Sequence, residues 1–242
     1  MSADDLGARF IDAFNEIEGH LRSRLRMQGR PRFTEMAREY VRINHLPQEH
    51  LDALRTFAAL RNAISHERYF GGSPIAQPVP GAVDLIELLR DLIRNPPRAL
   101  SVLGTMNVCS ASPKDPLSSV LDHVRRYDYS QLPVYHDGCY TGMLTTNAIS
   151  RWLADQLASK CSPTGDEKVS DVLAVAEPHE RGILAARTLT AADAIHQLTY
   201  GGPDGGQVNA LIITDHGLAA EAPLAVIVGW DLPRLLAAVS IT

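Results

Sequence analysis

Cysteine is scarce in this 242-residue chain, which has only Cys109, Cys139 and Cys161. Their odd number and wide spacing argue against a disulfide framework. Because no two of them form a C-x-x-C pair, the usual signature of a zinc site is also missing. We therefore expect three reduced thiols and assign no metal site.

Long apolar runs are absent as well. No stretch approaches the ~20 apolar residues that cross a bilayer. The first residues carry Asp4, Asp5, Arg9 and Asp12, a pattern unlike a signal peptide. Hydrophobic residues make up 45% of the chain and charged residues 21%, which is ordinary for a globular protein. We expect a cytoplasmic protein that does not contact a membrane and is long enough for two domains.

Lysine is missing from the first 98 residues, which contain 14 Arg and 13 acidic residues for a charge of +1. The rest of the chain carries 9 basic and 15 acidic residues, a charge of −6. Seven arginines gather in one short span: Arg22, Arg24, Arg26, Arg30, Arg32, Arg38 and Arg42. Such a cluster can attract nucleic acid, or it can be a solvated helix surface paired with Glu35 and Glu39.

Apolar residues recur every three or four positions through the first 98 residues, which predicts helices. We expect them at residues 4–27, from Phe33 to Ile43, from Pro47 to a glycine stop at 69–72, and at 82–94. Asn95-Pro96-Pro97 ends the last helix. The expected first domain is an all-α bundle of about four helices over residues 1–98.

The pattern then changes to short strands and helices, after a stretch at 100–109 that we expect to be extended or irregular. A helix from Leu117 to Val124 precedes a strand at 132–135, a hairpin turn at 136–138, a strand at 140–145 and a helix at 147–159. A diverged copy has strands at 183–186, 209–214 and 224–228, with Thr190 and Asp231 capping its helices. The expected fold class is α + α/β multidomain, with two β-α-β-β-α repeats at 99–162 and 163–242.

The end of the third helix carries Arg61, Asn62 and His66. Asn62 and His66 are four residues apart and share a helix face. An arginine holds phosphate with two hydrogen bonds, and a histidine moves protons near neutral pH. A plain helix end, with His66 favouring the helix dipole and Arg61 in a salt bridge, explains the same residues structurally.

This Arg-x4-His segment resembles the signature of the HEPN family, all-helical domains that commonly dimerise. The resemblance covers about residues 1–98 and implies a metal-independent ribonuclease that needs no catalytic cofactor. Arg61 would hold the scissile phosphate, His66 would act as general acid or base, and Asn62 would orient one of them. Some members carry a tyrosine two residues after the histidine, where this chain has Arg68.

The repeats resemble a tandem pair of CBS domains through residues 130–135, 142–145 and 225–231. The resemblance implies an adenine nucleotide (AMP, ADP, ATP or a cyclic dinucleotide) in a cleft between the repeats. It places nucleotide-binding residues at Ser110, Ala111, Thr145, Asn147, Arg187, Trp230 and Asp231. The family's Gly-x-x-Thr-x-x-Asp corner is incomplete in both repeats, because Ala148 replaces the acid in the first, and Ala225 and Val228 replace Gly and Thr in the second.

Together these resemblances imply a nucleotide sensor whose CBS pair regulates a HEPN-type ribonuclease dimer. The alternative is a regulatory scaffold without catalysis, in which the helical domain serves dimerisation or binding of a partner or RNA. Whether the chain is an enzyme stays open at this stage. The expected partners are a second copy of the chain, an adenine nucleotide and RNA.

Overall fold

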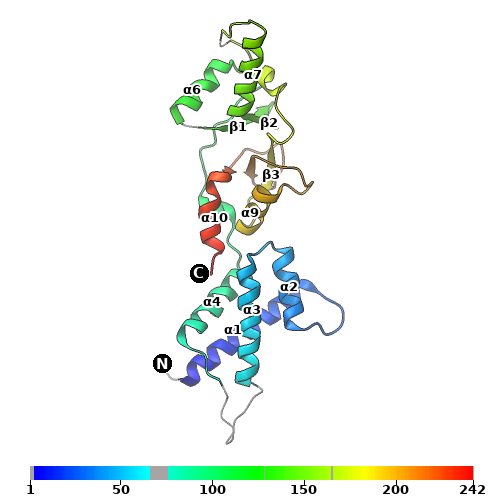
Figure 1. The fold of residues 1–242 in the computed structure, drawn as a ribbon, viewed down its shortest axis with the longest axis vertical. Helices are drawn as coiled ribbons and strands as arrows, with labels where there is room; N and C mark the ends of the chain where they lie inside the picture. The colour runs from blue at the N-terminus through cyan, green and yellow to red at the C-terminus, as the bar shows by residue number, and fades with distance from the viewer. Residues whose placement is uncertain (1–2, 66–75, 128, 165, 242) are drawn as a thin grey trace, which may run out of the picture. The chain divides into compact units, whose positions relative to one another are not determined.

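The computed structural model describes residues 3–65, 76–127, 129–164 and 166–241 (Figure 1). The chain divides into two compact units. The helical unit contains residues 1–97 together with the short segments 190–193 and 236–242. The mixed unit contains residues 98–189 and 194–235.

The helical unit contains α1 (Ala3–Leu25), α2 (Phe33–Ile43), α3 (Gln48–Ser65) and α4 (Pro80–Arg94). The sequence prediction for α2 is confirmed at both ends, and α4 begins two residues earlier than expected. The glycine stop expected for α3 at 69–72 lies outside the described residues.

The apolar periodicity of these helices is also the pattern of their burial. Phe10, Ile17 and Leu21 of α1 are fully buried. The same core contains Met36 of α2, Leu54 of α3 and the row Val83, Ile86, Leu89 and Ile93 of α4. Burial of each such side chain contributes about 1.5–3 kcal/mol, so the shared core holds the four helices together.

The first repeat of the mixed unit contains α5 (Ala99–Leu103), α6 (Leu117–Tyr127), β1 (Gln131–His136), β2 (Cys139–Thr145) and α7 (Thr146–Ala158). β1 and β2 form an antiparallel hairpin, as the sequence predicted. Its expected leading strand is reduced to a single parallel bridge between Ala111 and Val134 among the described residues. Part of the stretch that was expected to be extended or irregular, 100–109, instead forms α5.

The second repeat contains α8 (Val169–Leu173), β3 (Gly182–Ala186), α9 (Ala191–Tyr200), β4 (Ala210–Thr214), β5 (Ala225–Val228), the 3-10 turn η1 (Gly229–Asp231) and α10 (Leu232–Val239). β4 lies between β3, which is parallel to it, and β5, which is antiparallel. All five residues of β4 are buried. The second repeat therefore has the β-α-β-β-α order that the sequence predicted.

The two repeats are joined inside the mixed unit. The Tyr140 hydroxyl of β2 donates to the Gly182 carbonyl and accepts from the Gly182 N–H, at 3.2 and 3.1 Å. Met143 of β2 packs with Ala210 and Ile212 of β4 in one buried cluster. Across the described ranges, no helix is long and apolar enough to cross a membrane.

Candidate functional site

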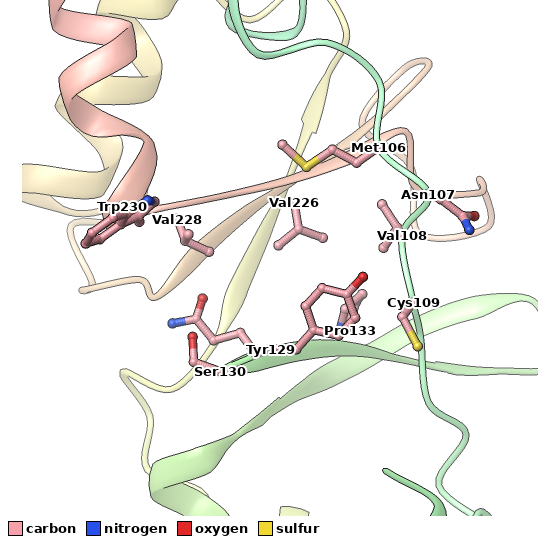
Figure 2. Close-up of a pocket in the computed structure, with 11 residues that line it drawn as sticks. Met106, Asn107, Val108, Cys109, Tyr129, Ser130, Pro133, Val226, Val228 and Trp230 are labelled. Carbon is pink, nitrogen blue, oxygen red and sulfur yellow. The ribbon is translucent and has the colours of Figure 1, made fainter. Parts of the chain in front are cut away.

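A cavity of about 730 Å³ lies in the mixed unit (Figure 2). Three stretches of chain line it: the segment 106–109, the start of β1, and β5 with the turn after it. The lining residues are Met106, Asn107, Val108, Cys109, Tyr129, Ser130, Gln131, Pro133, Val226, Val228 and Trp230. Its volume is in the range of pockets that hold small organic ligands.

Backbone hydrogen bonds hold the segment 106–109 in place as one wall of the cavity. At its first residue the segment is bonded to the second repeat, because the Met106 N–H donates to the Leu224 carbonyl at 2.9 Å. Two residues after the segment, the Ala111 N–H donates to the Pro133 carbonyl of β1 in the first repeat, at 3.0 Å. The segment thus crosses from one repeat to the other, and the cavity lies where both repeats contribute side chains.

The lining is mostly apolar and aromatic, with Asn107, Ser130 and Gln131 as its polar amide and hydroxyl side chains, and no charged side chain is among the described residues that form it. Val226 and Val228 of β5 lie opposite Tyr129 and Pro133 (Figure 2). Trp230 is 91% exposed although it is among the most apolar of side chains. An exposed indole at the edge of an apolar cavity offers a face on which a flat ring can stack.

One polar atom of the lining has no partner. The Oε1 atom of Gln131 is buried and accepts no hydrogen bond from the described residues. A buried acceptor without a donor costs about 1–3 kcal/mol. Because this oxygen is not accessible from the cavity, a ligand that brings an N–H group there would recover this free energy only after the Gln131 amide turns toward it.

Cys109 also lines the cavity. Burial raises the pKa of its thiol, which keeps the thiol protonated near neutral pH. A protonated thiol is a poor nucleophile. Cys109 therefore supplies polarisable apolar surface to the cavity rather than covalent chemistry.

Of the seven residues that the CBS resemblance marked for nucleotide binding, Trp230 lines the cavity. Ser110 and Ala111 directly follow the lining segment 106–109, with Ser110 exposed and Ala111 buried. Asn147 is exposed on α7. Arg187 is exposed, and its guanidinium donates to Asp215 at 2.9 Å.

Thr145 is 2% exposed, and its hydroxyl is already engaged. It accepts from the Ala148 N–H at 2.9 Å, which caps α7, and donates to Glu180 at 2.8 Å. Glu180 also accepts from Arg151 at 2.8 Å and from the Glu177 N–H at 2.9 Å. Burial alone would raise the pKa of Glu180, but these three donors outweigh it and hold the pKa below its ordinary value. The role of Thr145 in contacting phosphate stays a prediction.

Asp231 is the last residue of η1, directly before α10. Its carboxylate accepts from the Val228 N–H at 3.0 Å, which closes the turn between β5 and η1. We expected Asp231 to cap the last helix; in the structure it instead fixes the turn that carries Trp230. Its contact with a ribose stays a prediction.

Two of the three candidate catalytic residues, Arg61 and Asn62, lie near the end of α3. Arg61 is part-buried, with its guanidinium carbon 5.8 Å from the centre of the Phe14 ring of α1. Asn62 is exposed in the same turn. His66, the third candidate, lies outside the described residues. The arrangement of Arg61 toward His66 therefore stays a prediction from the sequence.

Most of the residues that line the cavity were not predicted from the sequence as site residues. Ser130, Gln131, Pro133, Val226 and Val228 belong to the segments that carry the CBS resemblance, but only Trp230 was singled out as a site residue. The remaining wall, 106–109, carries no motif. A signal was available in Gln131, a polar residue that opens a buried strand.

Neither protein-family models nor curated proteins match this chain. Solved structures of CBS-domain proteins are similar to its C-terminal part. One is the CBS domain of a CBS-domain-containing membrane protein from Sphaerobacter thermophilus, at 18% identity and a TM-score of 0.41, covering 58% of this chain and 88% of that one.

Two other solved structures were determined with nucleotides. CBSX2 in complex with AMP has 17% identity and a TM-score of 0.37, and the match covers 53% of this chain and 86% of that one. The CBS domain of a bacterial CNNM/CorC family Mg²⁺ transporter in complex with ATP has 15% identity and a TM-score of 0.42, covering 66% of this chain and 99% of that one. At these identities and TM-scores, the function of this chain has to be argued from its own residues.

Proposed function

We propose that the mixed unit is a CBS-type pair that binds an adenine-containing nucleoside or nucleotide in the cavity, and that the chain is a nucleotide-responsive regulator. The cavity between the repeats carries this proposal, with its aromatic and apolar walls and the buried Oε1 of Gln131. Adenine is flat, and its exocyclic amine is a hydrogen-bond donor. It can stack on Trp230, and it can donate to Gln131 once that amide turns toward the cavity.

The charge of the lining indicates which part of the ligand enters. Guanidinium or ammonium groups usually hold a phosphate, and the described lining has neither. The base and ribose therefore occupy the cavity, and any phosphates extend toward solvent. Adenosine and AMP should then bind with affinities within about tenfold of each other, a difference of about 1.4 kcal/mol, and ATP should gain nothing from its extra charge.

Isothermal titration of the full chain with adenosine, AMP, ADP, ATP and a cyclic dinucleotide tests this. Val226→Phe fills the cavity from the β5 side and should abolish binding. Leu121→Phe, a similar enlargement at an exposed position of α6 away from the cavity, should leave binding intact. If no ligand binds, or if Val226→Phe binds as well as wild type, the cavity is not the site.

The helical unit has a second candidate function, a metal-independent ribonuclease of the HEPN type in a homodimer. Exposed Asn62 and part-buried Arg61 at the end of α3 are the observation that favours it. Arg61 would hold the scissile phosphate, and His66 would move the proton of the RNA 2′-hydroxyl. The products would then carry a 2′,3′-cyclic phosphate.

Incubation of purified protein with RNA in EDTA, with and without adenine nucleotides, tests cleavage. Under this proposal His66→Ala lowers the rate at least about 100-fold, the usual contribution of acid–base catalysis, and Arg61→Ala lowers it by about 100-fold or more through loss of electrostatic stabilisation. Arg55→Ala, a change at another α3 arginine with only a surface ion pair to Asp52, should cleave as wild type. Cleavage that survives His66→Ala would contradict this mechanism.

The packing of Arg61 on Phe14 favours a non-catalytic alternative. In that case the helical unit is a dimerisation or docking platform, and the CBS pair recruits partners according to nucleotide. Failure of RNA cleavage together with retained ligand binding would select this alternative. For both versions we propose domains at 1–98, 99–162 and 163–242.

A further inference from the structure

The span from residue 22 to residue 42, here called the basic segment, contains the end of α1, the loop 26–32 and all but the last residue of α2. It carries seven arginines and two glutamates, a net charge of +5. All seven arginines are exposed.

Two of these arginines have carboxylate partners: Arg22 binds Glu18 at 2.9 Å and Arg42 binds Glu39 at 2.6 Å. The other five form no ion pair with the described residues: Arg24, Arg26, Arg30, Arg32 and Arg38. The second glutamate of the segment, Glu35, accepts a hydrogen bond from the Arg32 backbone N–H instead.

Outside the basic segment, four other arginines of the helical unit form ion pairs with carboxylates. Arg9 binds Glu87, Arg55 binds Asp52, and Arg90 and Arg94 both bind Glu16. Ion pairing is thus common for arginines of this unit, yet it is rare in the basic segment. If the arginines of the basic segment served only to solvate the surface, they would not need to be kept apart from carboxylates.

Helix stability explains only part of the placement. Arg22 and Arg24 lie in the last turn of α1, where cations favour the helix dipole. Arg32 is at the N-cap of α2, where Ser, Thr, Asp or Asn is preferred and where a cation opposes the dipole. Positive charge is therefore kept at a position where it is unfavourable for folding.

The concentrated charge also affects a neighbouring group. His20 of α1 has its Nε2 3.3 Å from the Tyr40 hydroxyl of α2. Burial lowers the pKa of His20, and the positive charges of Arg24 and Arg94 lower it further. His20 therefore adds no charge near neutral pH, and the arginines alone make the segment positive.

We infer that the basic segment binds the phosphodiester backbone of a single-stranded nucleic acid. Guanidinium groups bind phosphate oxygens with two parallel hydrogen bonds, and a run of five unpaired ones matches a polymer whose charges repeat along a chain. Met27 is the only large apolar side chain exposed in residues 22–42, and Ile43 is exposed directly after them, which is too little apolar surface for insertion into a lipid surface. This site is separate from Arg61 and does not depend on cleavage or on the cavity.

Fluorescence anisotropy of the full chain with a labelled RNA of about 20 nucleotides tests the inference, at salt from about 50 mM to 200 mM. The same sequence as DNA is run in parallel, because DNA lacks the 2′-hydroxyl that cleavage would need. Arg26→Gln/Arg30→Gln/Arg32→Gln removes three charges from the loop. The matched control, Lys114→Gln/Arg125→Gln/Arg126→Gln, removes three charges from the mixed unit, and thermal melts confirm that both variants fold.

We expect wild type and the control to bind RNA and DNA alike. The loop variant should lose at least about tenfold in affinity, and its salt slope should fall by about 2, since each phosphate contact on a single strand contributes about 0.7. Equal binding by the loop variant and wild type would overturn the inference. So would absence of oligonucleotide binding. Flotation with phosphatidylserine vesicles is run in parallel, and binding to the vesicles but to neither oligonucleotide would also overturn it.

Discussion

At the residue scale, the two most informative side chains are buried polar groups that differ in one respect. The carboxylate of Glu180 accepts hydrogen bonds from three donors: the Thr145 hydroxyl, the Arg151 guanidinium and the Glu177 N–H. Gln131 keeps a buried oxygen without a donor. A satisfied buried group stabilises the fold, whereas an unsatisfied one beside a cavity is a group that a ligand or an ordered water can satisfy.

Glu180→Gln should destabilise the mixed unit by about 1.5–3 kcal/mol, because hydrogen bonds to a charged group are lost. The folded pKa of Glu180 lies below its ordinary value, so its contribution is complete above the unfolded pKa and disappears as pH falls through the folded pKa. Urea unfolding at neutral and acidic pH measures both effects. A variant as stable as wild type at neutral pH would show that the network contributes little.

The sequence could not reveal how Thr145 is used. Its position in a corner motif suggested phosphate contact, but its two hydroxyl contacts, Ala148 and Glu180, include one that is 35 residues away in the chain. Thr190 was easier to predict because its capping contact is local. Its hydroxyl accepts from the Asp193 N–H at 3.0 Å, which confirms the predicted cap.

At the scale of elements, local patterns predicted most helices and the β1–β2 hairpin. The two turns of the repeats, around Gly138 and Gly217, both have a glycine at φ +79°. Their surroundings differ. A Cβ on Gly138 would meet nothing within 4 Å, whereas one on Gly217 would lie 3.1 Å from the backbone nitrogen of Ala186.

Gly138→Ala should therefore cost about 1–2 kcal/mol, the penalty of a left-handed conformation for an L-residue. Gly217→Ala should cost at least about 1 kcal/mol more, since a backbone atom cannot move aside as a flexible side chain can. Chemical denaturation of the two variants side by side provides the comparison. Equal losses of stability would mean that the turn at Gly217 relaxes away from β3.

The leading strand of the first repeat was the least predictable element. Residues 99–103 follow Pro96-Pro97 and form α5 instead, and Ser112-Pro113 and Pro116 interrupt the stretch before α6. Proline removes a backbone donor from a strand. The result is a single bridge at Ala111, and it leaves the segment 106–109 available to line the cavity.

At the scale of the whole molecule, the cavity depends on three stretches that are up to 124 positions apart, from Met106 to Trp230. Periodicity and motifs report local structure, so they could indicate two repeats but not which side chains meet between them. The cavity is the candidate nucleotide site, and the helical unit contributes a separate charged surface. A nucleotide response combined with nucleic-acid binding would make the chain a regulator with two distinct ligands.

The most direct test of the central claim uses the two tryptophans of the chain. Trp230 is 91% exposed at the cavity, while Trp152 is 5% exposed in the core of the first repeat. Titration with adenosine and AMP should quench or blue-shift the emission of Trp230, and Trp230→Phe should remove the response while Trp152 still reports a folded protein. If the emission of the wild-type protein stays unchanged up to millimolar ligand, adenine does not stack on Trp230 and the proposed nucleotide site is wrong.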